Sequence, residues 1–410
     1  MSRSRWLAAL LSGALALTGS PAYADDVPDR TVGFDGLVYT STHVGDTVYL
    51  GGSFTHAIVD GRRVVRKRLA AVDSRTGRLL PWAPVTDGTV MGLTSAGSSL
   101  YATGKFRTVG GRPRAGLAAI DLRTGAVGSM RHTVDGLGQT LTAANGRLYL
   151  GGDFRAVDGR PARNLAAFRL SDGSVDTGFA GAADGKVWAL TAAGSRLYVG
   201  GGFQKINGVS GTARLAALGL TDGKVDRAFR PATPYPAFAL TVAGDRVYAG
   251  LAGVGGRVQA YRPDGSLAWS SVTDGDVQAI TYLNGTVYAG GHFTVACPKP
   301  SRTATSWCPA QLRPQPKIAA WDPRTGALRD WNPRSNGKWG VLTLKSNPTL
   351  GTLTVGGDFT AFGNADRPRF AQFRPCPKGC ARRSGVAPSS GSMESSRAWH
   401  STDGARSLSS

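Results

Sequence analysis

Repeated Asp-Gly and Asn-Gly pairs supply the side chains of this sequence that could bind a metal ion. Each pair stands just ahead of an apolar segment, and their acidic or amide members are Asp35, Asp87, Asp135, Asp184, Asp274 and Asn336. On a ring around a channel mouth, their oxygens could hold a hard cation such as Ca²⁺. Asp-Gly also forms tight turns without any ligand. The sequence favours the turn and predicts no resident metal.

Basic residues form the second group with chemical potential, because guanidinium groups bind carboxylate and phosphate through paired hydrogen bonds. They gather between each Gly-Gly-x-Phe motif and the next apolar segment. The candidate ligand-binding residues, expected on the top face of a ring, are Arg62, Arg63, Arg66, Lys67, Arg112, Arg114, Arg160 and Arg163. One arginine recurs before several apolar segments, at Arg68, Arg114, Arg163, Arg214 and Arg369. Some of these must therefore serve the repeat by pairing with an aspartate, and the sequence leaves both roles open.

Catalytic motifs are scarce. The five histidines share no spacing, no HExxH or GxSxG motif occurs, and no carboxylate pair stands apart from the repeated turn aspartates. The sequence therefore predicts no catalytic residue and no activity of the protein's own.

A repeat must position these groups. The string apolar-Tyr-x-Gly-Gly-x-Phe occurs at Tyr49, Tyr149, Tyr198 and Tyr288, and degraded copies occur near 101, 248 and 354. A period of roughly 40 to 50 residues indicates stacked supersecondary units. In the third copy, Asn145-Gly146 predicts a hairpin between two strands, followed by a short apolar strand at 165–168. Tyr and Phe of each copy are predicted to be core residues.

The repeat predicts an all-β fold, a seven-bladed β-propeller of four-stranded antiparallel blades. The seventh copy stops after Phe373, whereas Val27 to Phe34 precedes the first copy with no partner. We expect this N-terminal segment to supply the missing outer strand of blade seven, which would leave no open sheet edge.

The chain beyond the repeat is predicted to include an export signal at 1–24. Arg3 and Arg5 precede the apolar run Trp6 to Leu17, and Ala22-Tyr23-Ala24 suits cleavage after Ala24. The run is too short to span a membrane, and no second span follows. The propeller is expected over 25–383, and a disordered Ser/Gly-rich tail over 384–410. The mature protein is expected to be extracellular and monomeric.

The four cysteines suit an oxidising compartment. Two local disulfides, Cys297 with Cys308 and Cys376 with Cys380, are favoured among three connectivities, and a zinc site lacks CxxC spacing. Cys297 and Cys308 lie in an insertion in blade six, 295–317, which also carries Arg302 and Trp307 as candidate ligand-binding residues. A loop plug over the channel is the alternative role of this insertion.

The pattern Gly-Gly-x-Phe, apolar-Ala and Asp-Gly-x-Val-Asp-x-x-Phe, at 172–179 and 222–229, resembles the secreted bacterial delta-60-type repeat. That resemblance implies a β-propeller of unassigned function over roughly Val27 to Pro375. A weaker likeness joins Ala71 to Gly77 with Trp82, and Ala320 to Gly326 with Trp331, to the tryptophan-docking motif of quinoprotein (PQQ) propellers. The spacing from Gly to Trp is one residue too long for that motif.

The formal net charge of +21 falls by two when Arg3 and Arg5 are removed. Such a surface attracts anions, although a GC-rich genome also enriches arginine. The sequence therefore predicts a secreted, non-catalytic propeller that binds an anionic cell-wall polymer, a polysaccharide or a protein at the envelope, with no specific nucleic acid. The alternative function is an extracellular carbohydrate-active enzyme, either a lyase or a quinone-dependent oxidoreductase.

Overall fold

The computed structural model describes residues 24–253 and 255–374, which contain strands and no helices. None of these residues forms a helix that could span a membrane. The predicted signal peptide up to 23, the predicted tail 384–410, and Cys376 and Cys380 lie outside the described residues.

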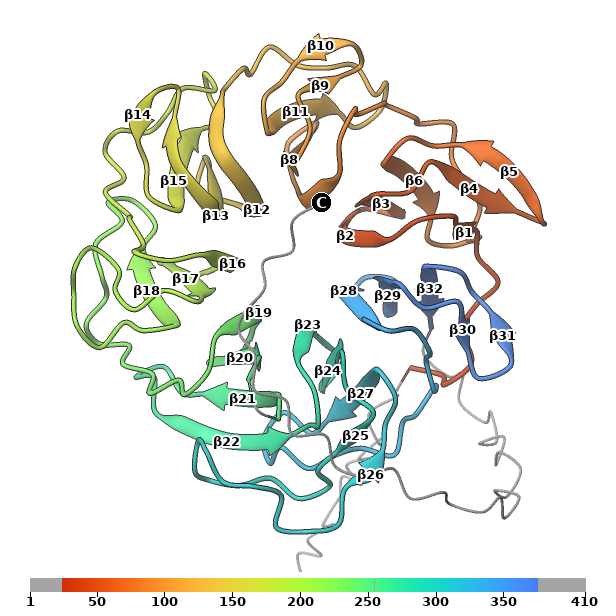
Figure 1. Cartoon of the computed structure of the whole chain (residues 1–410), viewed down its shortest axis with the longest axis vertical. Helices are drawn as coiled ribbons and strands as arrows, with labels where there is room; N and C mark the ends of the chain where they lie inside the picture. The colour runs from red at the N-terminus through yellow and green to blue at the C-terminus, as the bar shows by residue number, and fades with distance from the viewer. Residues whose placement is uncertain (1–23, 254, 375–410) are drawn as a thin grey trace, which may run out of the picture. The chain divides into compact units, whose positions relative to one another are not determined.

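The repeat folds into small antiparallel sheets arranged around a common centre (Figure 1). In each sheet the first strand lies innermost and a hairpin joins it to the second strand, which pairs with the third. The strand triplets are β2 (Val38–Val44), β3 (Thr47–Gly52) and β6 (Leu69–Asp73); β7 (Val90–Ala96), β8 (Ser99–Gly104) and β11 (Leu117–Asp121); β12 (Val134–Ala144), β13 (Arg147–Val157) and β15 (Leu165–Arg169); β16 (Val187–Ala193), β17 (Arg196–Gly201) and β18 (Leu215–Gly219); β19 (Ala237–Ala243), β20 (Arg246–Leu251) and β21 (Arg257–Tyr261); β23 (Val277–Leu283), β24 (Thr286–Gly291) and β27 (Ile318–Trp321); and β28 (Val341–Asn347), β29 (Thr352–Gly357) and β32 (Phe370–Phe373).

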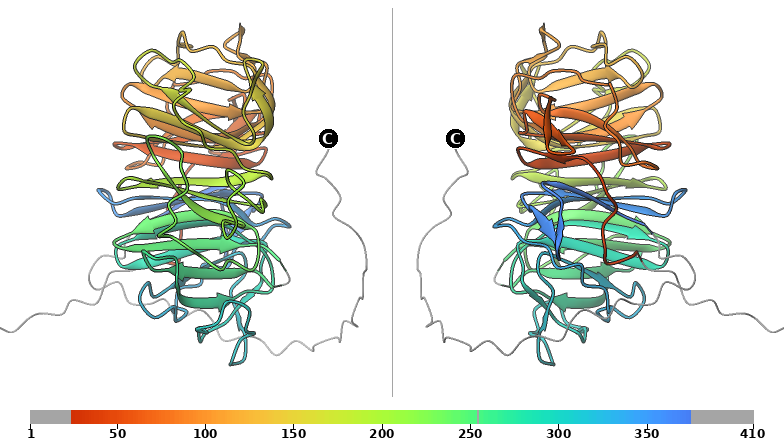
Figure 2. Two further views of the ribbon diagram at one scale, coloured as in Figure 1. Left: turned by 90° about the vertical axis from the view of Figure 1, so that its left-hand side faces the viewer. Right: turned by 90° about the vertical axis from the view of Figure 1, so that its right-hand side faces the viewer.

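The first and last sheets are neighbours. The Ser41 and Thr343 hydroxyls lie 3.3 Å apart, and the Asn347 side-chain amide donates to the Gly45 carbonyl. In side view the strands run along the short dimension of this unit (Figure 2), so strand beginnings and strand ends lie on opposite faces.

The predicted fourth strand is complete only in the sheet that ends with β22 (Leu267–Val272). In five other sheets it is reduced to one bridge, as in Val72 with Leu79 and Phe168 with Val175, and the described residues show no such bridge to β32. In the third sheet the chain turns away directly after this bridge, where the Asp176 carboxylate accepts the Gly178 N–H and closes a turn. The four-stranded prediction is therefore wrong for most of the sheets.

Short hairpins follow the second strands and lie at the outer edge of the unit (Figure 1). They comprise β4 (His56–Val59) with β5 (Arg62–Val65), β9 (Thr108–Val109) with β10 (Arg112–Pro113), β14 (Arg160–Pro161) with the end of β13, β25 (Val295–Ala296) with β26 (Arg313–Pro314), and β30 (Ala361–Phe362) with β31 (Ala365–Asp366).

The N-terminal segment contacts both the first and the last sheets. Its strand β1 (Gly33–Phe34) pairs with β4 in the first hairpin. The residues before β1 bond instead to β32 and the residue after it: the Asp29 N–H donates to the Gln372 carbonyl at 2.8 Å, and the Asp25 N–H donates to the Arg374 carbonyl at 2.7 Å. Part of the segment predicted for blade seven thus belongs to the first hairpin.

The blade-six insertion pairs with the neighbouring sheet. Ser301 forms a two-way backbone bridge with Ser270 of β22, and the Cys297 N–H donates to the Val272 carbonyl. The insertion therefore covers the outer edge of β22, which would otherwise be an open sheet edge. The predicted Cys297–Cys308 disulfide is present, with Cα atoms 5.5 Å apart.

The paired glycines of the second strand mark two close approaches. A Cβ atom at Gly51 would lie 2.6 Å from Val90 in the next sheet, and one at Gly356 would lie 2.5 Å from Val38. A Cβ at the second glycine of a pair would meet backbone, as at Gly152, 2.1 Å from the Leu137 carbonyl oxygen. The adjacent Tyr and Phe side chains are buried, as predicted.

Replacing Gly152 by alanine should destabilise the protein by about 3 kcal/mol, because the Leu137 carbonyl belongs to the paired strand and cannot move aside. Gly128 is the matched control, since its Cβ would meet Ala119 at an ordinary 3.4 Å. Urea unfolding of Gly152→Ala and Gly128→Ala measures both changes. Equal stabilities of the two variants would contradict this account of the paired glycines.

Candidate functional site

The predicted ring of carboxylates is engaged by backbone hydrogen bonds. Oδ1 of Asp87 accepts the Arg107 and Thr108 N–H groups at 2.8 and 2.9 Å. The same two-donor arrangement recurs at Asp35, Asp184, Asp274 and Asn336. Each side chain thereby joins the entry to a sheet to the start of its outer hairpin. Within residues 24–253 and 255–374, no three His, Cys, Asp or Glu side chains are grouped so as to hold a metal ion.

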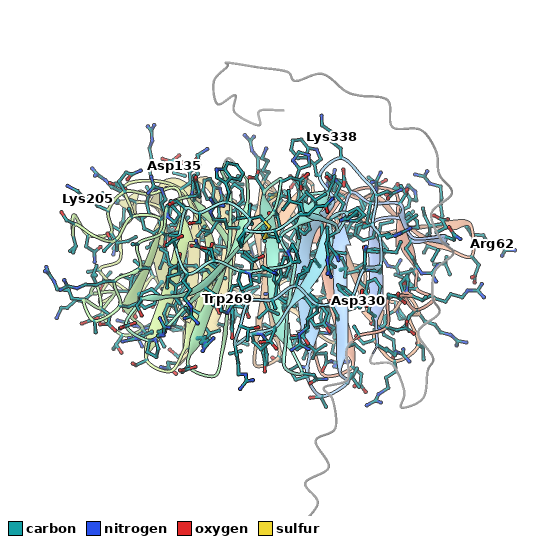
Figure 3. All side chains as sticks on the ribbon, turned by 90° about the horizontal axis from the view of Figure 1, so that it is seen from below. Arg62, Asp135, Lys205, Trp269, Asp330 and Lys338 are labelled. Atoms are coloured by element: carbon teal, nitrogen blue, oxygen red, sulfur yellow. A yellow bond between two sulfur atoms is a disulfide. The ribbon has the colours of Figure 1, made fainter. Side chains whose placement is uncertain are left out.

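Asp135 is the exception among these positions. It is exposed within the longer strand β12 and lies at one face of the unit (Figure 3). In this sheet Asp158, and not Asp135, bonds to the chain at the sheet entry. Its Oδ1 accepts the Thr133 N–H, and its Oδ2 lies 2.6 Å from His132 Nδ1. Sequence reasoning placed Asp135 with the other turn aspartates because it shares their Asp-Gly pattern.

The Asp35 carboxylate has the most hydrogen-bonding partners of the set. Besides two N–H groups it accepts from the Thr55 hydroxyl at 2.7 Å and from Arg63 Nη2 at 2.8 Å. Burial of this side chain, which is 16% exposed, raises the pKa of Asp35, but hydrogen bonds from His56 and Thr55 outweigh it and lower that pKa to about 2. Because Arg63 donates to this carboxylate, its side chain has a structural contact.

Asp35 should make stability depend on pH. Its folded-state pKa lies below the ordinary value of 3.8, so its contribution is present above that value and lost as the pH falls toward 2. The contribution should be about 2 kcal/mol. Denaturant unfolding of wild type and Asp35→Asn should give a stability difference at about pH 6 that shrinks by about pH 2.5. A difference that stays constant over this range would show that the Asp35 charge does not stabilise the fold.

A left-handed residue recurs just before the third strands, and three of the recurring arginines, Arg68, Arg214 and Arg369, occupy it. Arg68, Gly116, Asn164, Arg214, Lys317 and Arg369 all have φ between 62° and 82°. Each N–H donates to the carbonyl of the preceding motif Phe, as Arg68 does to Phe54. The Arg68 and Arg214 guanidinium groups donate to the Thr86 and Thr233 carbonyls, at the entry to the next sheet. These two arginines hold adjacent sheets together.

A second set of arginines bonds to the outermost chain segments. Arg66 Nη2 donates to the Leu80 carbonyl at 2.7 Å, and Arg114 Nη2 donates to the Gly128 carbonyl at 2.5 Å. Arg114 is buried, and burial lowers its pKa, as do nearby Arg112 and Arg131. Arg66 and Arg114, both predicted to bind ligand, thus have structural contacts.

The remaining basic side chains in and beside the hairpins of the first three sheets are exposed. We call them the basic edge: Arg62, Lys67, Arg107, Arg112, Arg155, Arg160 and Arg163. None of them forms an ion pair with any part of the chain that the structure describes. Figure 3 shows Arg62 at the outer edge, and Figure 1 places β5, β10 and β14 there in successive sheets. The few nearby carboxylates are engaged, since Asp60 pairs with Arg30 and Asp158 contacts His132.

Several arginines elsewhere are matched by carboxylates. Arg147 and Arg169 both pair with Asp176, Arg196 pairs with Asp226, and Arg329 pairs with Asp322. These pairs lie beside the turns that follow the third strands. The contrast separates arginines that pair with carboxylates of the fold from those that are exposed and form no ion pair among the described residues.

The insertion residues lie apart from the basic edge. Trp307 is 66% exposed and Arg302 is exposed. A Cβ at Gly255 would lie 3.3 Å from the Trp307 ring, so this ring packs beside Gly255. The insertion contains β25 and β26, which lie far around the unit from β5 and β10 (Figure 1).

Sequence reasoning missed a set of bulge residues on the innermost strands. At Tyr39, Met91, Gln139, Trp188, Phe238, Gln278 and Leu342, a register shift inserts one residue opposite the glycine pair. These side chains are half-buried, and Trp188 meets Phe238 edge-on at 4.7 Å. The sequence spacing could have identified these bulge residues, because in most repeats the bulge residue stands four positions after the turn aspartate.

Comparison with known proteins agrees with this architecture. A model of the family described as "Domain of unknown function (DUF5122) beta-propeller" matches residues 143–179. The crystal structure of the WD40 β-propeller domain of Doa1 is similar over 86% of this chain and 96% of that domain, with a TM-score of 0.55 and 11% identity. The fold is that of a β-propeller.

A computationally designed protein, Ika8, matches with a TM-score of 0.48 and 14% identity over 86% of this chain and all of that chain. No curated protein matches the sequence significantly.

In this propeller, Trp82 and Trp331 are buried, and their indole N–H groups donate to the Asp121 and Asp25 carbonyls at 3.0 Å. The tryptophans that suggested a quinoprotein thus bond to neighbouring backbone.

Proposed function

We propose that this chain is an exported, non-catalytic propeller that binds an anionic polymer along its basic edge. The observation that carries the proposal is the row of exposed basic side chains with no ion-pairing carboxylate, on the hairpins of three successive sheets. Unpaired cations spaced along an edge attract a chain of negative charges better than one small anion, since each further contact releases more counterions. The Cys297–Cys308 disulfide supports an oxidising compartment, as export would provide.

The proposal includes a ring of seven blades, of the delta-60 type that the repeat resembles, closed by the N-terminal segment. In the first two sheets, one residue beyond the third strand makes two bonds. The N–H groups of Leu80 and Gly128 donate to carbonyls at the third residue of β6 and of β11. The carbonyls of Leu80 and Gly128 each accept a hydrogen bond from an arginine. Asp29 repeats both contacts, because its N–H donates to Gln372 and its carbonyl accepts Arg367 Nε at 2.7 Å. We infer that residues around Asp29 take the place of the outer strand of the last blade.

Removing residues 25–34 should therefore destabilise the protein strongly, because it exposes the edge of β32 and removes β1 from its pairing with β4. Removing 384–410 is the matched control and should leave stability unchanged. Thermal unfolding and solubility of the two truncated proteins measure the difference. Equal tolerance of both deletions would show that the ring closes without this segment.

Charge reversal tests the polymer site. Arg62→Glu, Arg112→Glu and Arg160→Glu together should lower affinity for teichoic acid or heparin at least tenfold. They should also reduce the slope of log K against log salt by about three, one for each lost contact. The control is Arg78→Glu, Arg123→Glu and Arg324→Glu, three exposed cations on the turns after the third strands, which change the net charge equally.

Fluorescence polarisation with labelled polymer at several salt concentrations gives both quantities. Equal loss in the two triple variants would mean that the net positive charge acts as a diffuse field. Absence of wild-type binding at low salt would remove the proposed function.

A further inference from the structure

The blade-six insertion forms a hollow that is separate from the basic edge. Its volume is about 420 Å³. Pro298, Lys299, Gln311, Leu312 and Arg313 line it from the insertion, and Leu328 lines it from the turn after β27. Arg313 and Leu328 have counterparts in other sheets, whereas Pro298, Lys299, Gln311 and Leu312 belong to the long insertion alone, so the insertion accounts for most of the lining.

The disulfide and a short hairpin together fix the two walls. Pro298 and Lys299 follow Cys297 directly, and the segment 310–313 begins two residues after Cys308. At the other end of these walls, Val295 and Ala296 pair with Pro314 and Arg313. The Leu328 N–H donates to the Pro298 carbonyl at 3.3 Å, which joins the turn after β27 to the insertion on one side of the hollow. The hollow is therefore held in shape before any ligand arrives.

The chemistry of the lining combines positive charge with apolar surface. Lys299 and Arg313 are exposed, and neither forms an ion pair or side-chain hydrogen bond among the described residues. Leu312 is 38% exposed, and Leu328 is half-buried against the core. The exposed Gln311 adds an amide that can both donate and accept.

We propose that this hollow binds a carboxylate-bearing sugar unit, a hexuronate of an acidic polysaccharide. The two cations would take the carboxylate, the leucines and Pro298 would meet the apolar face of the sugar ring, and Gln311 would bond a hydroxyl. A fatty-acid chain suits the hollow poorly, because an acyl tail needs enclosure by apolar atoms and this lining carries three exposed polar side chains. The site does not depend on the basic edge, so either proposal can fail alone.

The test is calorimetric titration of the full chain with hexagalacturonate at low salt. The comparison ligands are cellohexaose, which has similar sugar faces without charge, and octanoate, which has a carboxylate on an acyl chain. We expect hexagalacturonate to bind and both comparison ligands to bind at least tenfold more weakly.

Variants assign the binding to the hollow. Lys299→Ala with Arg313→Ala should weaken hexagalacturonate at least tenfold. Arg302→Ala with Trp307→Ala is the matched control, because it removes one exposed cation and one exposed large side chain of the same insertion outside the lining, and it should bind as wild type does. Leu312→Asp should also weaken binding, since it adds a like charge and removes apolar surface. Circular dichroism establishes that the variants are folded.

The site is overturned if wild type does not bind hexagalacturonate, or if the lining and control variants lose affinity alike. It is also overturned if only the triple variant of the basic edge reduces binding. Octanoate binding as tight as hexagalacturonate would overturn the sugar assignment. Cysteine to serine replacement at 297 and 308 adds an independent readout: affinity should fall because the walls separate, and unchanged affinity would contradict the fixed-wall argument.

Discussion

The close approach of adjacent strands at the glycine pairs is the constraint on which the structure depends. Gly51 leaves room for Val90 of the next sheet, and Gly152 leaves room for the backbone of its own inner strand. Any side chain there would push the sheets apart and open the centre. The bulge residues lie at the same place, because the inner strand shifts its register opposite the glycine pair. A short motif therefore coincides with both the sheet spacing and the bulge of each inner strand.

Much of the fold could be predicted from sequence, because the repeat shows which residues are equivalent. The hairpins, the buried Tyr and Phe residues, and the Cys297–Cys308 pair follow from local spacing. The single-bridge outer strand could not be predicted, because the turn at Asp176 depends on a side-chain bond that composition does not reveal. The pairing of β1 with β4 was hidden for a similar reason: two residues carry too little pattern to choose a partner.

The candidate site was less predictable, because arginine has several roles that look alike in sequence. Arg63, Arg66 and Arg68 stand within six residues, yet they bond to a carboxylate, to an outer-strand carbonyl and to the entry of the next sheet. Arg62 and Lys67, between and beside them, meet solvent. Only the positions of acceptors in other sheets separate these roles. Charge counts alone would have treated all five residues as one patch.

The contacts of the N-terminal segment also bear on how the chain reaches its folded state. The side chains of Asp29 and Gln372 bond across 343 positions in the sequence, and Trp331 bonds to the Asp25 carbonyl. Contacts of such separation form late, because the chain must close a very large loop before they contribute any stability. The earliest-synthesised part of the repeat region therefore cannot complete its contacts until the last strand, β32, has been synthesised.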